Sequence, residues 1–205
     1  MPQRRNVPPR FTRPTVFLSE RNPVRGRLSQ PGLTEDDRRQ LLDSADKGAK
    51  FSKCRRYRYT LWRKWHDDDS AEMLMFIGLN PSTADETQDD PTVRRCIRFA
   101  MDWGFGGLLM MNAFAFRATD PKVMKAEPEP VGPGNDKAFR THRTQVGLIV
   151  AAWGTHCTPE REQCICHVLN RPIYCLGQTK SGRPKHPLYL RADTEPQLFW
   201  SPDAK

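Results

Sequence analysis

The sequence predicts an α/β fold, a three-layer α/β/α sandwich with a mainly parallel sheet of about four core strands and one edge strand. Short, continuously apolar runs such as M-L-M-F-I-G-L (73–79) are typical of strands buried on both faces. These runs alternate along the chain with segments of helical periodicity. Strands that alternate with helices usually form a parallel sheet with helices on both sides.

The first 50 residues are expected to form a basic, proline-containing arm with one short helix over 34–45, capped by Thr34. Residues 1–29 contain seven Arg, one Glu and no Lys or Asp, so they carry +6 of the net charge of +9. Such an arm attracts polyanions, nucleic acid above all, but it equally suits a solvated tail that only aids solubility. We predict a single α/β domain over 51–195 and a C-terminal tail over 196–205.

The elements of the domain follow in order. The run R-R-Y-R-Y-T-L-W-R-K-W (55–65) alternates aromatic and basic residues and predicts an amphipathic strand at a sheet edge. D-D-D (67–69) predicts a turn. Core strands are predicted at 73–79, 108–116, 146–153 and 173–176, and helices at 91–103, 136–145 and 159–169. In the first of these helices, apolar residues recur with helical spacing and form one face that is expected to be buried: Val93, Cys96, Ile97, Ala100 and Met101.

The composition indicates where in the cell the protein is expected and whether it is expected to bind a cofactor. No apolar run approaches the roughly 20 residues of a membrane span, and the N-terminus lacks the apolar core of a secretion signal, so we expect a cytoplasmic protein without a membrane partner. The six Cys include no C-x-x-C pair, and Cys164 and Cys166 flank a single residue, which is outside the usual zinc spacings. We expect buried thiols and no metal or other cofactor. The oligomeric state cannot be read from the sequence.

Polar residues gather where the predicted strands end, which is where ligands bind in parallel α/β folds. Gly78, Asn80 and Pro81 follow the first core strand, and Asn112 lies within the second. A buried amide without a partner costs about 1–3 kcal/mol, so Asn112 should bind either backbone or a ligand. Asn80 has a structural alternative, because a residue before Pro is held extended and can simply close a turn.

Three further strand-end residues complete the candidate site: Arg117, Trp153 and His186. Alone, His186 equally suits a loop hydrogen bond, and Gly78 equally suits a bend. Together these residues predict a small polar pocket. Amide side chains offer a donor and an acceptor side by side, the pattern found on the edge of a nucleobase.

Several motifs closely resemble a family of uncharacterised bacterial and phage proteins, domain of unknown function 1643. The resemblance covers roughly residues 54–190. Its motifs stand in the family's order: Y-R-Y-T-L-W, I-G-L-N-P-S-T-A-D, D-P-T-V-R-R-C, N-A-F-A-F-R-A-T-D-P, V-G-P-G-N-D, A-A-W-G and G-R-P-K-H-P-L-Y-L.

A more distant resemblance is to the uracil-DNA glycosylase superfamily, whose members are three-layer α/β sandwiches. The run Gly78-Leu79-Asn80-Pro81 matches a motif that follows their first core strand, and it implies that Asn80 positions the attacking water. Asn112 matches an asparagine that reads the base. His186-Pro187 matches a late motif that stabilises the departing base, with Leu188 or Leu190 as a wedge into the duplex.

The chain also departs from the glycosylase pattern. Ser82 stands where some members carry an aromatic residue, and no cysteine pattern of the iron–sulfur branch is present. S-T-A-D (82–85) and N-D (135–136) are additional polar motifs, from which we take Ser82, Thr83 and Asp85 as further substrate-binding candidates. The identity of the base is therefore left open.

Three functions are compatible with these patterns. The first is a glycosylase-like hydrolase that cleaves an N-glycosidic bond in a nucleotide or in nucleic acid, DNA rather than RNA, with Arg183, Lys185 and the basic arm holding phosphates. The second is a non-catalytic module of the same fold that binds nucleic acid or a nucleotide. The third is an enzyme acting on a small nucleotide-like substrate with Mg²⁺ held by Asp85 and Asp136.

Overall fold

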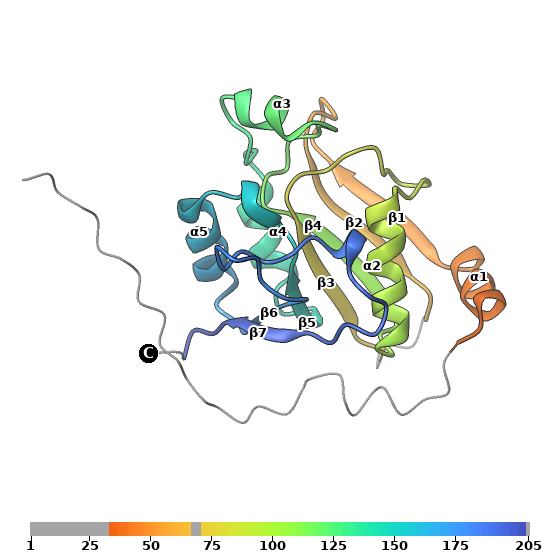
Figure 1. Ribbon diagram of the computed structural model, residues 1–205. Coiled ribbons are helices and arrows are strands. Elements are labelled where there is room, and N and C mark those ends of the chain that lie inside the picture. The colour runs from red at the N-terminus through yellow and green to blue at the C-terminus, as the bar shows by residue number, and fades with distance from the viewer. Residues whose placement is uncertain (1–32, 67–70, 204–205) are drawn as a thin grey trace, which may run out of the picture.

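The computed structural model describes residues 33–66 and 71–203. The predicted basic arm up to residue 32 and the predicted turn at 67–69 lie outside the described residues. The described chain forms one seven-stranded sheet with helices packed against it (Figure 1). None of the described helices is both long enough and apolar enough to span a lipid bilayer.

The strands are β1 (Asp46–Phe51), β2 (Arg58–Lys64), β3 (Met73–Gly78), β4 (Gly107–Asn112), β5 (Val146–Ala151), β6 (Ile173–Cys175) and β7 (Gln197–Trp200). The α-helices are α1 (Glu35–Asp43), α2 (Pro91–Asp102), α3 (Pro121–Ala126), α4 (Asn135–His142) and α5 (Pro159–Leu169). Two 3₁₀ helices are η1 (Gly154–His156) and η2 (Pro187–Tyr189).

The sheet is mixed, with the strand order β1-β2-β4-β3-β5-β6-β7. The four predicted core strands β4, β3, β5 and β6 are neighbours and run parallel. The three remaining pairs are antiparallel: β1 with β2, β2 with β4, and β6 with β7. The expectation of a mainly parallel sheet is therefore not confirmed, because a hairpin extends the parallel centre at one edge and a reversed strand extends it at the other.

Two strands lie in segments for which the sequence analysis predicts no strand. Residues 46–51, expected in the arm, form β1 beside β2, so β2 is an inner strand and the prediction that it forms the edge is wrong. Residues 197–200, expected in a tail, form β7. Both strands are partly exposed at the sheet edges, and the polar D-K-G-A-K-F of β1 gives no apolar signal.

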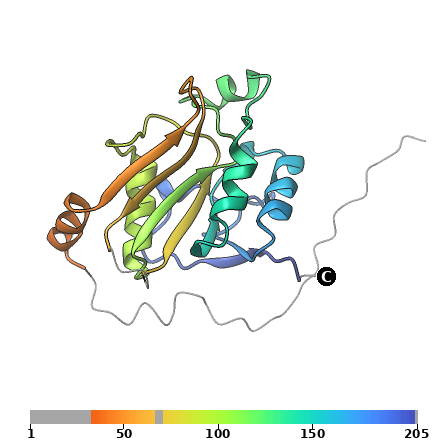
Figure 2. The same cartoon turned by 180° about the vertical axis from the view of Figure 1, so that it is seen from behind.

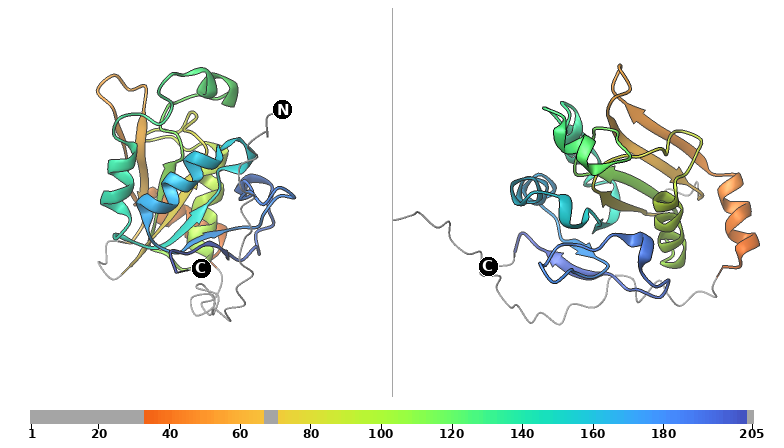
Figure 3. Two further views of the ribbon diagram at one scale, coloured as in Figure 1. Left: turned by 90° about the vertical axis from the view of Figure 1, so that its left-hand side faces the viewer. Right: turned by 45° about the horizontal axis from the view of Figure 1, so that its top comes forward.

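Helices cover both faces of the sheet, as Figures 1 and 2 show from opposite sides. On one face, α2 packs its predicted apolar face onto the sheet, and Phe76, Phe99 and Trp103 form an aromatic group there. On the other face, α4 and α5 bury residues such as Phe139 and Ile165. The edge-on view in Figure 3 places α2 and α4 on opposite sides of the sheet.

Local sequence explains where the main helices begin. Thr34 caps α1 as predicted, and its hydroxyl accepts a hydrogen bond from the Asp37 amide while the Asp37 carboxylate accepts from the Thr34 amide. Asp90 caps α2, and Pro91 occupies the first turn, where its missing N–H costs nothing. The N-cap carboxylate of α2 thus lies just beyond the carboxyl end of the sheet, beside the candidate site.

Candidate functional site

A cavity of about 220 Å³ opens at the carboxyl ends of β3 and β4, beside the first turn of α2. Five residues singled out in the sequence line it: Gly78, Asn80, Ser82, Asn112 and His186. They come from β3, the loop after it, β4 and the segment before η2. The structure thus brings together residues that are far apart in the sequence, as the strand-end rule predicts.

Four polar residues that the sequence analysis did not assign to the site also line the cavity: Arg58, Asp90, Thr92 and Thr119. Arg58 begins β2, and Asp90 and Thr92 belong to the start of α2. The D-P pair before a helical pattern marks an N-cap, so Asp90 was detectable as a helix start but not as a cavity residue.

Asn112 is the most buried amide in the lining of this cavity. Its side chain is 2% exposed, and its Oδ1 accepts a hydrogen bond from Arg58 Nη2 at 3.0 Å. Because Arg58 can only donate, the amide is oriented with its oxygen toward the guanidinium. Among the described residues, Asn112 Nδ2 has no acceptor, although Gly78, its partner in register on β3, lies close to it. Asn112 Nδ2 is therefore an oriented hydrogen-bond donor that has no partner within residues 33–66 and 71–203.

Arg58 provides a buried positive charge beside Asn112. The residue is 2% exposed, and its second terminal nitrogen, Nη1, donates to the Ala84 carbonyl oxygen at 2.8 Å. Burial lowers the pKa of Arg58 to about 10, and the charge of Asp90 opposes this change. A guanidinium with this pKa is still protonated at neutral pH, so the cavity wall carries a cation.

Asn80 is held by backbone contacts. Its Nδ2 donates to the Ala118 carbonyl oxygen at 2.6 Å and to the Pro81 carbonyl oxygen at 3.2 Å, while the Ala118 amide donates to Pro81 at 2.9 Å. Asn80-Pro81 thus ties the loop after β3 to the chain after β4. Since both partners of the amide nitrogen are acceptors, Oδ1 is left as an acceptor without a donor among the described residues.

His186 caps η2 through its ring. Nδ1 accepts a hydrogen bond from the Leu188 amide at 3.4 Å, so the neutral ring carries its proton on Nε2. The residue as a whole is exposed, yet part of it lines the cavity. Desolvation lowers the pKa of His186, and the negative charge of Asp90 partly opposes this. The cavity therefore borders on a neutral imidazole that can donate through Nε2.

Asp90 is the only carboxylate in the described lining of the cavity. One of its oxygens, Oδ1, accepts from the Val93 amide at 2.8 Å, and Oδ2 has no partner among the described residues. Its charge acts on both Arg58 and His186. The cavity thus combines a cation, an anion, amide groups and an imidazole in a small space.

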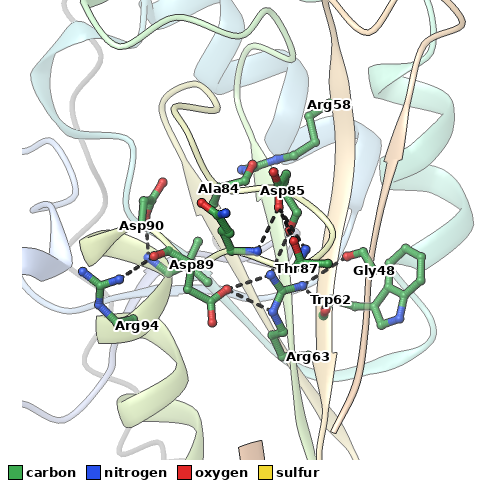
Figure 4. Close-up of polar contacts among 12 residues, drawn as sticks. Gly48, Arg58, Trp62, Arg63, Ala84, Asp85, Thr87, Asp89, Asp90 and Arg94 are labelled. Atoms are coloured by element: carbon green, nitrogen blue, oxygen red, sulfur yellow. Dashed lines mark hydrogen bonds and ion pairs between the residues drawn. The ribbon is translucent and has the colours of Figure 1, made fainter. Parts of the chain in front are cut away.

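The S-T-A-D motif mainly builds the loop that borders the cavity. Buried Arg63 of β2 donates to the Asp85 carbonyl oxygen at 2.8 Å and forms an ion pair with Asp89 at 2.7 Å (Figure 4). The Asp85 carboxylate accepts from the amides of Gln88 and Thr87, and these hydrogen bonds lower the pKa of Asp85. Asp85 itself does not line the cavity.

The two carboxylates considered as Mg²⁺ ligands lie in different parts of the fold. Asp136 is in α4, where it pairs with buried Arg161 at 2.7 Å, whereas Asp85 belongs to the loop before α2 on the opposite face. Among residues 33–66 and 71–203, no three His, Cys, Asp or Glu side chains gather as a metal site. All six cysteines are free thiols, and four of them are buried: Cys96, Cys157, Cys166 and Cys175.

Besides Pro81, Thr83, Asp85 and Arg117, four predicted site residues lie outside this lining. Trp153 is 1% exposed and packs in the core against Phe199, with its Nε1 donating to Glu162. Arg183 forms an ion pair with the same Glu162 at 2.9 Å, so its charge is already matched. The other two are Lys185, which is exposed, and Leu188, which is half-buried.

A wider depression of about 560 Å³, here called the outer groove, adjoins the cavity. Its lining consists of Arg55, Arg56, Ser82, Thr83, Phe116, Arg117, Ala118 and Thr119. Ser82, Ala118 and Thr119 also line the cavity, so the two spaces share a border. The predicted site residues Thr83 and Arg117 therefore lie next to the cavity, in this second space.

Comparison with known proteins places the chain in a family. A family model described as a protein of unknown function (DUF1643) matches residues 58–188, which include the strand of Arg58, the loop of Asn80, Asn112 and His186. No curated protein and no solved structure matches the chain. The family match covers more than half of the sequence, and the chain belongs to the DUF1643 family.

Proposed function

We propose that this protein binds a nucleobase in the cavity and hydrolyses the N-glycosidic bond that joins the base to its sugar, in DNA or in a nucleotide. The observation that carries the proposal is the convergence of Asn80, Asn112 and His186 on one cavity. These are the three residues for which the resemblance to uracil-DNA glycosylases implies a role in base recognition or base release.

The size and polarity of the cavity suit a base. Its volume of about 220 Å³ is below the roughly 300–1,000 Å³ of pockets for drug-sized ligands, so it suits a single ring system with the sugar outside. Asn112 Nδ2 offers a donor that no described residue uses, and Asp90 offers a carboxylate oxygen. A base edge that presents an acceptor beside a donor satisfies both groups.

The proposed reaction needs a positioned water and a stabilised leaving group. Asn80 Oδ1 accepts a hydrogen bond from the water, whose oxygen forms a bond to the sugar C1′ and releases a proton to solvent. The bond between C1′ and the base nitrogen breaks, and its electron pair leaves with the base. His186 Nε2–H donates to the negative charge that develops on the base, which requires the neutral or protonated ring.

The test is a screen for base release. Single-stranded and duplex oligonucleotides that carry uracil or other modified bases are incubated with the full chain and then treated with alkali, which breaks the strand where a base is missing. Asn80→Ala should lower release by about 100-fold or more while leaving oligonucleotide binding nearly intact. Asn80→Asp keeps an acceptor oxygen but loses donation to Ala118, so it should retain more activity than Asn80→Ala. Equal release by wild type and Asn80→Ala contradicts the proposal.

One observation favours a second candidate, a non-catalytic module that binds a nucleotide or nucleic acid. The amide nitrogen of Asn80 is engaged by the Ala118 and Pro81 carbonyl oxygens, which gives this residue a structural role without any water. This candidate predicts binding that weakens steeply with salt and no product from any modified base. Binding without release by the wild-type protein distinguishes it from the first proposal.

A further inference from the structure

The outer groove has a charge arrangement that the proposed base site does not explain. Three arginines line it, Arg55, Arg56 and Arg117, and the buried Arg58 lines the adjoining cavity. The groove lining contains no Asp or Glu among the described residues. Its hydroxyl groups, on Ser82, Thr83 and Thr119, are uncharged donors.

Two of the three arginines are already neutralised. Arg55 forms a two-pronged ion pair with Glu86 at 2.8 and 3.0 Å, and Arg56 pairs with Glu127 at 2.8 Å. These carboxylates fix the orientation of the Arg55 and Arg56 guanidinium groups. The third arginine of the groove, Arg117, differs from these two.

Arg117 has no carboxylate within ion-pair distance among the described residues. Its Nη1 donates to the Arg55 carbonyl oxygen at 3.4 Å, and its guanidinium lies 5.0 Å from the centre of the Phe51 ring. The Nε group is buried and lacks an acceptor. The charge of Asp85 acts on Arg117 only from beyond ion-pair distance. A half-buried cation without a direct ion-pair partner is costly, and an anionic ligand reduces that cost.

The position of Arg117 is fixed by the β1–β2 hairpin. Its backbone amide donates to the Arg56 carbonyl oxygen at 2.9 Å, and the preceding Phe116 pairs with Tyr57. Arg55 and Arg117 both lie over the ring of Phe51, at 4.1 and 5.0 Å. The cation is thus held in place before any ligand arrives, which reduces the entropy lost on binding.

We propose that the outer groove binds a phosphate group of the molecule whose base occupies the cavity, with Arg117 as the main cationic contact and Ser82 and Thr83 as hydroxyl donors. The ligand is then a phosphorylated nucleoside unit, and neither a free base nor an unphosphorylated nucleoside. This inference rests on the proposed function for the occupant of the cavity. A free nucleotide and a nucleic-acid strand supply the same phosphate chemistry.

The experiment compares ligands with and without phosphate. The four common deoxynucleosides and deoxyuridine, their 5′-monophosphates, inorganic phosphate and short single-stranded oligonucleotides are titrated into the full chain by calorimetry at fixed salt. We expect the phosphorylated forms to bind at least about 10-fold more tightly than the nucleosides, because hydrogen bonds to charged groups are stronger than those between neutral groups. Arg117→Gln should remove that difference without changing nucleoside affinity.

A second variant covers the case in which Arg117→Gln fails to fold. Thr83 is exposed in the groove, so Thr83→Glu adds a negative charge with little effect on packing, and Thr83→Gln is its uncharged match. Both variants lose the Thr83 hydroxyl, but only Glu adds a charge that repels phosphate, so Thr83→Glu should weaken phosphate-dependent binding more than Thr83→Gln does. Arg39→Gln serves as the charge control, since Arg39 is 76% exposed on α1, away from the groove.

The same titrations also show whether the phosphate belongs to a free nucleotide or to a nucleic-acid strand. If a strand is the ligand, oligonucleotides bind more tightly than the monophosphates, and Arg117→Gln reduces the slope of log affinity against log salt by about 0.7. If a free nucleotide is the ligand, the monophosphates bind as tightly as the oligonucleotides. Equal affinity for nucleosides and their phosphorylated forms, or a phosphate preference unchanged by both charge-altering variants, overturns the inference.

Failure of this inference is distinguishable from failure of the proposed function. Base release with no effect of Arg117→Gln or Thr83→Glu on binding overturns the phosphate site and leaves the hydrolase. Phosphate-dependent binding without base release from any substrate overturns the hydrolase and leaves the phosphate site.

Discussion

Arg58 of β2 and Asn112 of β4 are joined by a buried hydrogen bond of 3.0 Å between guanidinium Nη2 and amide Oδ1. Both residues are 2% exposed. The contact fixes the orientation of the Asn112 amide and leaves Nδ2 as the free donor, because a guanidinium accepts no hydrogen bonds. It also explains how a polar side chain is accommodated in an otherwise apolar strand.

Arg58→Met tests this contact. The substitution keeps a long side chain but removes the donors to Asn112 and to the Ala84 carbonyl oxygen, and each unsatisfied buried acceptor costs about 1–3 kcal/mol. We expect a lower free energy of unfolding in urea and weaker ligand binding. Arg39→Met, at an exposed position, should change neither. Wild-type stability and affinity in Arg58→Met would show that the contact is dispensable.

Gly78→Ala should affect the site more than the fold. A Cβ at Gly78 would lie 2.9 Å from Asn112 Nδ2 and 2.9 Å from the Met110 side-chain methyl, which is closer than such atoms approach. Both are ends of flexible side chains, so we expect overpacking to cost about 1–3 kcal/mol and to displace the amide. Ligand affinity measured by calorimetry should fall. Unchanged affinity would mean that the Asn112 amide does not contact the ligand.

The titration of His186 should make stability depend on pH. Burial lowers its pKa from the ordinary value near 6.5, so below that value the unfolded chain binds more protons than the folded one. Stability from the neutral ring is therefore fully present above about pH 6.5 and is lost as pH falls through the folded pKa. NMR should show the His186 ring titrating below 6.5, and urea unfolding of His186→Asn should lack this pH dependence. A His186 pKa above 6.5 contradicts the expected desolvation of the ring.

The ion pair between Arg63 and Asp89 should stabilise the loop beside the cavity. Arg63 has no exposed side-chain surface, and Asp89 is its carboxylate partner at 2.7 Å. Asp89→Ala leaves a buried cation without its counter-ion, a change that typically costs about 3–5 kcal/mol. We expect a matching loss in urea unfolding and faster proteolysis within residues 79–90. Asp36→Ala, whose carboxylate is 86% exposed, is the control and should behave like wild type.

Much of the fold was predictable because the core strands and main helices have strong local patterns. M-L-M-F-I-G-L and the apolar face of α2 appear where the sequence predicts them. The edge strands were not predictable in this way, since β1 is mostly polar and β7 has four residues. The short helix α3 begins at Pro121 in a segment for which the sequence analysis predicts no element, and six residues give too little periodicity to detect it.

The site was predictable in part, for a related reason. Two criteria pointed to Asn80 and Asn112: the position of Asn80 at a strand end, and the cost of burying the Asn112 amide. Both criteria need only the direction of the chain and the burial of the strand, which the sequence predicts. The partner of Asn112 depends on the register between β2 and β4, and Arg58 carries no local signal of that register. Arg183 resembled a free cation in the sequence, but Glu162, distant along the chain, neutralises it.

The order in which the cavity is assembled has a consequence for biosynthesis. His186 is reached only after the chain has passed through β6, whereas β2, β3, α2 and β4 precede it. A ribosome-bound chain therefore exposes a pocket that lacks His186 until the segment before η2 has emerged. Nascent polypeptides halted upstream of that histidine should fold much of the sheet and yet lack ligand affinity.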